Sequence, residues 1–170
     1  MKILFLDIDG VLNGHEWDDE AKSCNIRREC VKHLNRVVKE TGCRIVLSSA
    51  WRYMIHGGQM TLKGFGYLLR THGLVTEIGA MNILIGLTRK DDESVDPMDL
   101  KRDERGQQCR EWLSLALGMV GYSPSVFAAV DDDDQGFAEH GIPAVITDGK
   151  LGMTEADADR LITILGRINT

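Results

Sequence analysis

Three short apolar segments of the chain each end in residues that could bind a metal ion or a phosphate group. Asp7-Ile8-Asp9 follows the first segment, Ser48-Ser49 follows the second, and the acidic run 131–134 follows the third. Carboxylates gathered at one place raise one another's pKa values unless a cation neutralises them. Oxygen ligands without a His or Cys cluster favour Mg²⁺ over zinc or copper. We therefore expect a magnesium site where these segments meet.

Magnesium beside an aspartate is a setting for phosphoryl transfer. Asp7 could attack phosphorus and form an aspartyl-phosphate that water later hydrolyses. Asp9 could protonate the leaving oxygen and then activate that water. An acidic pair by itself could also be a turn or a helix cap. The apolar segment before the pair and Gly10 after it favour the catalytic interpretation.

The apolar segments have the length and composition of buried parallel strands. Residues 3–6 and Arg44–Leu47 read as strands, and between them residues 25–40 carry apolar positions at helical spacing, with Gly42 as a stop. Strand, helix and strand in this order predict a right-handed crossover and a parallel sheet. The carboxyl ends of parallel strands lie at one edge of an open sheet, where ligands bind. The polar residues after the three strands should therefore meet.

The same signals place the remaining elements. In chain order we predict a helix near Leu62–Thr71, a short strand over residues 82–87, a loop over residues 90–103, a helix from Arg105 through Trp112 and Leu117, a strand over residues 126–130, and a helix and strand pair that ends at Ala144–Ile146. Thr154-Glu155-Ala156-Asp157 resembles a capping box before a last helix. The prediction is an α/β fold, Rossmann-like, with three layers (α/β/α) around a central parallel sheet, in a single domain of residues 1–170.

Composition limits the class of protein. With 170 residues and 43% hydrophobic content, the chain can bury a core without disulfides or metals. A formal net charge of -6 argues against a broad basic surface for long nucleic acids, although it allows a local basic pocket. No apolar run approaches the roughly 18 residues that a membrane span needs. The four cysteines form no Cys-x-x-Cys pair, so free thiols in the cytoplasm are expected, and no protein partner is implied.

The run Phe5-Leu6-Asp7-Ile8-Asp9-Gly10-Val11-Leu12-Asn13 resembles the first motif of the haloacid dehalogenase (HAD) superfamily. The resemblance implies that Asp7 is the nucleophile and Asp9 the general acid and base. It also implies that a backbone carbonyl, of Ile8 or preferably of Asp9, binds Mg²⁺ together with the Asp7 carboxylate. Ile45-Val46-Leu47-Ser48 is similar to the second motif, whose hydroxyl binds the phosphoryl oxygens, and Ser49 is a further candidate for that contact.

The later motifs follow in the order of the superfamily. Arg105 matches the basic residue of the third motif, with Lys101 and Arg102 as competitors. Asp131-Asp132, after Val130, matches the paired acids that hold magnesium in the fourth motif. Asp133 and Asp134 fit a solvated loop or the start of a helix better than a metal site.

The spacing of the motifs favours a site with no cap domain or a minimal one. In the superfamily an open site goes with large substrates, such as nucleic-acid ends or phosphoproteins. Ser48-Ser49-Ala50-Trp51-Arg52 adds a looser resemblance to small phosphatases associated with RNA-repair proteins. Arg52 would suit a second phosphate contact, or a structural ion pair. The segment from Asp9 to Ser48 leaves room for a flap and one helix. Trp17 and Trp51 could stack on a base, or else anchor this flap or pack in the core.

The resulting hypothesis is a magnesium-dependent phosphomonoester hydrolase that acts on a phosphorylated substrate. A more specific alternative is a phosphatase that acts on a nucleotide or a nucleic-acid end. A receiver-type signalling domain is an alternative, because it also combines an acidic cluster, a Ser or Thr residue and a basic residue. The Asp7-Ile8-Asp9-Gly10 spacing and the absence of a lone Asp after a third strand argue against it. A binding module that keeps magnesium without turnover is the other alternative.

Overall fold

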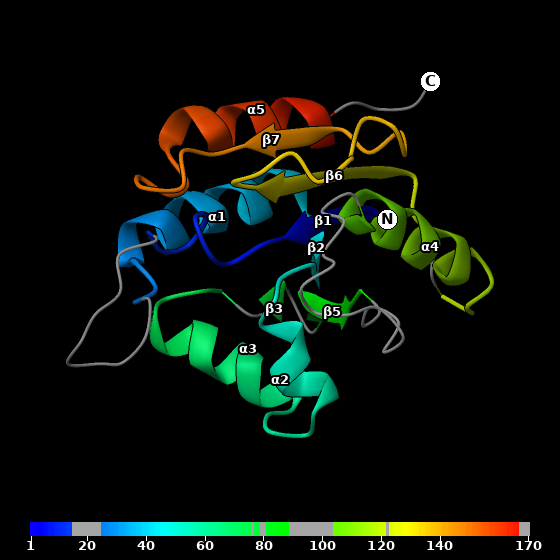
Figure 1. The fold of residues 1–170 in the computed structure, drawn as a ribbon, viewed down its shortest axis with the longest axis horizontal. Helices are drawn as coiled ribbons and strands as arrows, with labels where there is room; N and C mark the ends of the chain where they lie inside the picture. The colour runs from blue at the N-terminus through cyan, green and yellow to red at the C-terminus, as the bar shows by residue number, and fades with distance from the viewer. Residues whose placement is uncertain (15–24, 76, 79–80, 89–103, 122, 167–170) are drawn as a thin grey trace.

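Five parallel strands form the central sheet of the computed structural model, which describes residues 1–14, 25–75, 77–78, 81–88, 104–121 and 123–166 (Figure 1). The strands are β1 (Lys2–Leu6), β2 (Arg44–Leu47), β5 (Leu84–Leu87), β6 (Val126–Asp131) and β7 (Ala144–Ile146). Their spatial order is β5-β2-β1-β6-β7. The chain therefore builds the sheet outward from β1 in one direction and then in the other, which puts the switch point between β1 and β6. The predicted Rossmann-like α/β fold is confirmed.

Helices cover both faces of the sheet. The helices α1 (Arg28–Thr41), α3 (Leu62–Thr71) and α5 (Glu155–Gly166) share one core with the side chains of Leu4 and Leu6. The helix α4 (Glu104–Leu117) packs on the opposite face, where Phe5 meets Trp112 edge-on with ring centroids 5.8 Å apart. Alternate residues of β1 thus point into two separate cores, as expected for a strand buried on both sides. The predicted three layers are confirmed.

Most predicted elements agree with the structure to within a few residues. The strand β2 and the helix α3 have the predicted bounds, and α1 ends at Gly42, whose left-handed φ of 68° lets its N–H reach the Val38 carbonyl. The strand predicted over residues 82–87 is divided. Its first residue belongs to β4 (Met81–Asn82), which pairs with β3 (Glu77–Ile78) outside the main sheet, and its last four form β5. A short helix, α2 (Arg52–His56), follows β2.

The helix predicted just before β7 is wrong. Residues 132–143 form bends and turns that connect β6 to β7. Gly136 and Gly141 have φ values of 70° and 63°, which lie in the left-handed region and interrupt any helix. Phe137 and Ile142 instead insert into the core beneath α4. Burial of these two side chains against α4 outweighs the local preference for a helix.

Several predictions concern residues outside the described part of the chain. The loop over residues 90–103 and most of the flap after Asp9, with Trp17, belong there. The minimal cap and the single domain therefore stay predictions. Cys30, Cys43 and Cys109 are free and buried, and Cys24 is not among the described residues. Among the described helices, none combines the length and the apolar character that a membrane crossing requires.

The predicted capping box at the start of α5 gives a test of the fold. Asp157 Oδ2 accepts hydrogen bonds from Thr154 N at 2.8 Å and Thr154 Oγ1 at 2.6 Å, and Thr154 Oγ1 accepts from Asp157 N at 3.3 Å. Thr154→Ala should lower the free energy of unfolding by about 1 kcal/mol, measured by urea denaturation. Thr163→Ala, which removes an exposed hydroxyl from the same helix, is the matched control. Equal effects of the two changes would contradict the capping role.

Candidate active site

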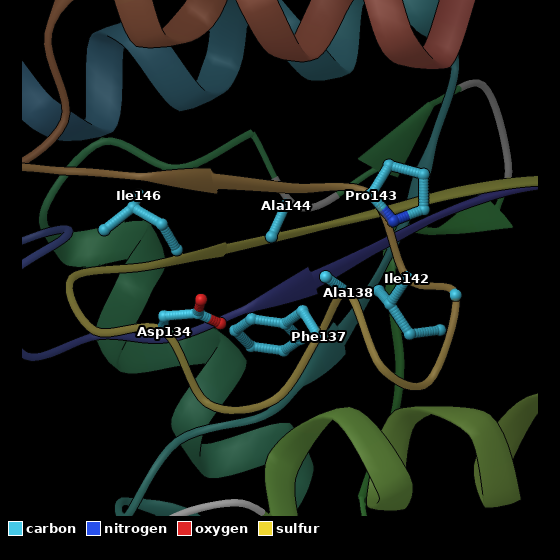
Figure 2. A pocket seen from close by; sticks show the side chains of 8 residues that line it. Asp134, Phe137, Ala138, Ile142, Pro143, Ala144 and Ile146 are labelled. Atoms are coloured by element: carbon cyan, nitrogen blue, oxygen red, sulfur yellow. The ribbon is translucent and has the colours of Figure 1, made fainter.

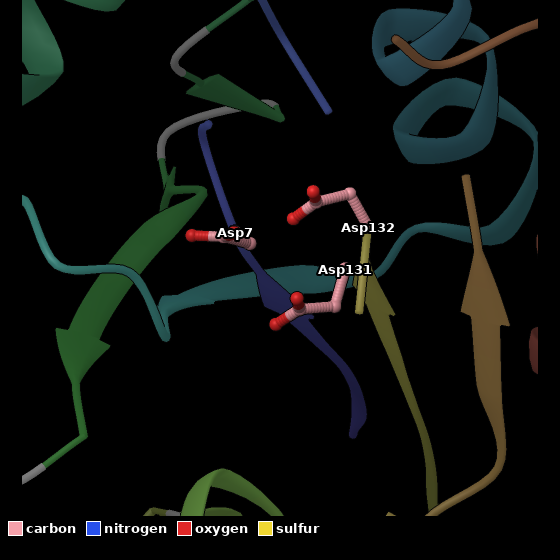
Figure 3. A group of neighbouring side chains, drawn as sticks. All are labelled: Asp7, Asp131 and Asp132. Carbon is pink, nitrogen blue, oxygen red and sulfur yellow. The ribbon is translucent and has the colours of Figure 1, made fainter. Parts of the chain in front are cut away.

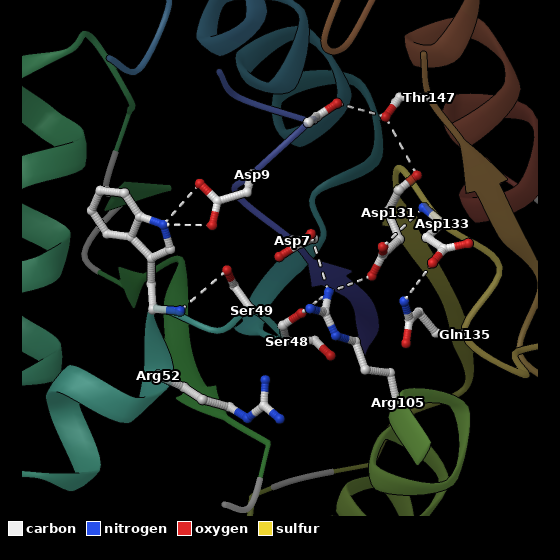
Figure 4. Close-up of polar contacts among 12 residues, drawn as sticks. Asp7, Asp9, Ser48, Ser49, Arg52, Arg105, Asp131, Asp133, Gln135 and Thr147 are labelled. Atoms are coloured by element: carbon white, nitrogen blue, oxygen red, sulfur yellow. Dashed lines mark hydrogen bonds and ion pairs between the residues drawn. The ribbon is translucent and has the colours of Figure 1, made fainter. Parts of the chain in front are cut away.

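The polar residues after β1, β2 and β6 meet at the carboxyl edge of the sheet, as predicted (Figure 4). Asp7 N donates to the Val130 carbonyl at 3.0 Å, which continues the pairing of β1 with β6. On the other side of β1, Ser48 N donates to the Leu6 carbonyl at 2.8 Å. The residues that follow β1 and β2 are therefore held by backbone hydrogen bonds to the neighbouring strands β6 and β1, and their side chains start from fixed positions.

Three carboxylates converge at this edge. Asp7, Asp131 and Asp132 each offer one oxygen, and these oxygens all lie within 4.8 Å of one another (Figure 3). Gly10 makes the approach of Asp132 possible, because a Cβ on Gly10 would lie 2.5 Å from Asp132 Cγ and its φ of 71° is left-handed. The chain after β1 can thus fold directly over the end of β6.

The next two acids of the run have different surroundings. Asp133 N donates to Asp131 Oδ1 at 3.2 Å, and Asp133 Oδ2 accepts from Gln135 at 3.2 Å. Asp134 is exposed and lines a shallow hollow of about 430 Å³ whose other walls come from residues 137–146 (Figure 2). This mainly apolar hollow contains none of the three clustered acids. Asp131 and Asp132 are therefore the members of the run that face Asp7.

Arg105 neutralises part of this charge. Its Nη1 lies 2.7 Å from Asp131 Oδ2, 3.1 Å from Asp7 Oδ2 and 3.2 Å from the Ser48 carbonyl. Arg105 stands in the first turn of α4, where the helix dipole also favours negative charge. The competing candidates Lys101 and Arg102 lie outside the described residues.

A glycine sets the position of Arg105. Gly106 N donates to the Gln135 carbonyl at 3.0 Å, and a Cβ on Gly106 would come within 2.4 Å of the Gly136 carbonyl oxygen. Any larger residue would push the start of α4 away from the loop after β6. The contact of helix and loop fixes how far Arg105 reaches toward the acids.

Burial and mutual repulsion shift the pKa values of the acids. Burial raises the pKa of Asp7, although the Arg105 charge and the Ser49 hydroxyl partly offset it. Burial, reinforced by the negative charge of Asp7, raises the pKa of Asp131 to about 7, with Arg105 acting in the opposite direction. Burial acts to lower the pKa of Arg105, but the charges of Asp7 and Asp131 raise this pKa by more than burial lowers it. The cluster therefore holds more negative charge than Arg105 balances.

The site has the properties of a place for a hard divalent cation. Asp7 Oδ1 is buried and, among the described residues, has no hydrogen-bond partner. A buried oxygen of this kind is costly unless something binds it. All the converging side-chain donors are carboxylate oxygens, which Mg²⁺ prefers. The described residues thus fit the ion that the motifs imply.

Asp9 stands apart from the cluster. Its carboxylate accepts from Asn13 Nδ2 at 2.8 Å and from Trp51 Nε1 at 3.0 and 3.1 Å (Figure 4). The side chain therefore points toward Trp51, and a contact of Asp9 with the metal through its backbone carbonyl stays a prediction. The two alternatives for Trp51 included core packing, and its ring does meet Phe65 with centroids 5.8 Å apart. Its hydrogen bond to Asp9 was not predicted.

The two serines have different partners. Ser48 Oγ lies 3.7 Å from the buried Cys109 Sγ, while the Ser48 carbonyl accepts from Arg105. The hydroxyl of Ser49 lowers the pKa of Asp7 and accepts from Trp51 N at 3.4 Å. Of the two hydroxyl groups, that of Ser49 is the one that acts on the predicted nucleophile.

Arg52 and Thr147 complete the surroundings of the site. The Arg52 guanidinium donates to Gln108 at 3.1 Å and lies 4.7 Å from the Tyr53 ring centroid, so it connects α2 with α4. Its contact with substrate phosphate stays a prediction. Thr147 was not predicted. Its hydroxyl donates to the Gly10 carbonyl at 2.8 Å and so connects the chain after β7 to the turn after β1. Its position directly after a strand was the one available signal.

The family comparison agrees with this geometry. Residues 3–158 match the family described as the HAD domain in Swiss Army Knife RNA repair proteins, and the chain belongs to that family. The match confirms both the superfamily resemblance and the looser resemblance to RNA-repair proteins. A comparison with curated proteins found no match. Family membership supports hydrolase chemistry of the phosphatase type. HAD domains generally use Mg²⁺ as their cofactor.

The raised pKa of Asp131 predicts how stability depends on pH. The folded metal-free protein keeps a proton on Asp131 where the unfolded chain has lost it. The protonated Asp131 side chain therefore leaves the free energy of unfolding at its full value below pH 3.8, and this free energy falls as the pH rises to about 7. In urea denaturation without metal, Asp131→Asn should gain at least about 1 kcal/mol relative to wild type between pH 5 and pH 8. The exposed Asp134→Asn is the control, and a pH-independent difference for Asp131→Asn would contradict the assignment.

Proposed function

We propose that this protein is a magnesium-dependent phosphomonoester hydrolase that works through an aspartyl-phosphate on Asp7. The observation that carries the proposal is the position of Asp7 at the switch point of the sheet. There it is buried, one of its oxygens contacts Arg105, and the other has no described partner. An unpartnered carboxylate oxygen facing two further acids suits a nucleophile that needs a cation beside it. Membership of the HAD family supports the same chemistry.

The reaction begins when a carboxylate oxygen of Asp7 attacks phosphorus. The bond from phosphorus to the ester oxygen breaks, and that oxygen leaves with a proton from Asp9. Asp9 then takes a proton from water, the water oxygen attacks phosphorus, and inorganic phosphate leaves while the Asp7 carboxylate is restored. Mg²⁺ held by Asp7, Asp131, Asp132 and the Asp9 carbonyl would supply positive charge to offset the carboxylates and the phosphate.

Basic and hydroxyl groups orient the phosphoryl group in this proposal. Arg105 offsets part of the negative charge beside the nucleophile and can donate to a phosphoryl oxygen. Ser49 is the favoured hydroxyl donor, with Ser48 and Arg52 as further candidates from the sequence. These donors hold phosphorus in line with Asp7, and positioning of this kind is a large part of phosphoryl-transfer catalysis.

We further propose a phosphorylated nucleic-acid end as the substrate class. The family description names RNA repair, and repair requires chain ends whose phosphates have been corrected. An end needs only a local site for one phosphate, which the acidic net charge of -6 permits. Nucleotides, sugar phosphates and phosphopeptides serve as comparison substrates. Turnover restricted to one of those classes would replace the nucleic-acid proposal, and no turnover of any would favour a binding module.

Removal of the nucleophile tests the reaction itself. Asp7→Asn keeps the size of the side chain and should lower magnesium-dependent phosphate release from 4-nitrophenyl phosphate by at least about 10³-fold. Chelation of the metal in the wild-type protein should have a similar effect. Asp134→Asn, in the exposed part of the acidic run, should leave the rate unchanged. Retained activity of the Asp7→Asn protein would end the proposal.

The different positions of the two serines give a second test. Ser49→Ala should lower kcat/KM by roughly 10- to 100-fold, because a hydrogen bond to a charged group contributes about 1.5–3 kcal/mol. Ser48→Ala should change it by less than about threefold, since that hydroxyl lies near Cys109. Steady-state kinetics on one substrate measure both variants. A larger loss for Ser48→Ala than for Ser49→Ala would reverse the assignment.

A further inference from the structure

Trp51 holds the carboxylate of Asp9 in a defined orientation. Its indole Nε1 lies 3.1 Å from Asp9 Oδ1 and 3.0 Å from Asp9 Oδ2, so one N–H group is shared by both oxygens. An indole N–H can only donate. The contact joins the turn after β1 to the turn after β2, across 42 positions of the chain. The carboxylate faces the indole and stands outside the cluster of Asp7, Asp131 and Asp132.

The indole itself has little freedom. Trp51 N donates to Ser49 Oγ at 3.4 Å, and Trp51 is the residue before α2. The ring packs against Phe65 of α3, which is completely buried in the core shared by α1 and α5. The position of the donor is thus set by the core that α1, α3 and α5 share and not by solvent. A side chain fixed in this way can fix its hydrogen-bond partner.

A second donor completes the contact from the other side. Asn13 is fully buried, and its Nδ2 donates to Asp9 Oδ1 at 2.8 Å. Its Oδ1 accepts from Gly10 N at 2.9 Å, which fixes the amide orientation. Asp9 is therefore held between donors from two segments, and rotation of its carboxylate toward the metal cluster would break both sets of hydrogen bonds.

We propose that Trp51 is a positioning residue, assisted by Asn13, that directs the Asp9 carboxyl toward the leaving oxygen of the substrate. This inference rests on the proposed phosphatase function. When the bond from phosphorus to the ester oxygen breaks, the electron pair goes to that oxygen and the proton comes from Asp9. The two N–H donors are already in place for the carboxylate that remains. Trp51 therefore determines how well poor leaving groups, such as the sugar hydroxyls of nucleic-acid ends, are released.

The experiment compares substrates that differ in their need for a proton. The 4-nitrophenolate leaving group departs without protonation, whereas phenolate depends much more on it, and general acid catalysis is worth about 10²–10⁴-fold. Trp51→Phe keeps the aromatic packing and removes the N–H. It should lower kcat/KM for 4-nitrophenyl phosphate by less than about threefold and for phenyl phosphate by about 30-fold. A loss of the same size for both substrates would overturn the positioning role.

Matched variants separate orientation from packing. Phe65→Leu keeps the N–H and loosens the ring contact that positions it, so its loss should also be larger for phenyl phosphate, but smaller than that of Trp51→Phe. Trp51→His retains an N–H donor and should recover part of the phenyl phosphate activity. In the Asp9→Asn background, Trp51→Phe should cause no further selective loss, because the two residues act as one unit. Independent, multiplicative effects of the two changes would contradict the proposal.

A spectroscopic measurement tests the contact without turnover. In ¹⁵N-labelled metal-free protein, Asp9→Asn should move the indole N–H resonance of Trp51, while that of Trp112, which packs on the opposite face, stays in place. An unchanged Trp51 resonance would overturn the inference. Failure of the two proposals is distinguishable. If the wild-type protein hydrolyses no phosphate ester, the proposed function fails; if it does so and Trp51→Phe shows no leaving-group preference, only the role of Trp51 fails.

Discussion

Negative charge buried at the switch point of the sheet is the constraint on which the rest of this site depends. Asp7, Asp131 and Asp132 converge there, and carboxylates taken out of water cost several kcal/mol each unless positive charge compensates them. Arg105 supplies one positive charge from α4, which packs on the face of the sheet opposite to α1, α3 and α5. The absence of a side chain on Gly106 lets α4 come close enough for that contact. The close packing of α4 against the loop after β6 is therefore also what brings the compensating charge to the acids.

The carboxylates on the two sides of this site have different surroundings and different supports. Asp7 lies between β6 and α4, where burial raises its pKa and a guanidinium opposes that shift. Asp9 lies two residues farther along and is held by uncharged N–H donors, one of which rests on the α3 core through Phe65. Separate environments for two acids are the usual means by which enzymes give them separate tasks. In this fold each environment comes from a different face of the sheet.

Local patterns were sufficient for the strands of the central sheet, apart from the division of the segment 82–87, for most of the helices and for the acids that follow the strands. A short apolar segment ended by Asp7 or by Asp131 indicates a buried strand and a polar edge together, because parallel strands end at the same side. The hydrogen bond from Trp51 to Asp9 and the one from Thr147 to Gly10 leave no local pattern, since each joins segments far apart in the chain. The same holds for the helix wrongly predicted before β7, where core contacts and left-handed glycines prevail over local preference.

The pairing of β1 with β6 also bears on the order in which the molecule is built. β1 is synthesised before the other described strands, yet its partner on the Asp131 side begins only at Val126. During synthesis the chain can pair β1 with β2 early, while the opposite edge of β1 stays open until β6 arrives. The acidic cluster cannot exist before that late, long-range pairing. A cation at this site would therefore stabilise only chains in which β6 has been synthesised and has paired with β1.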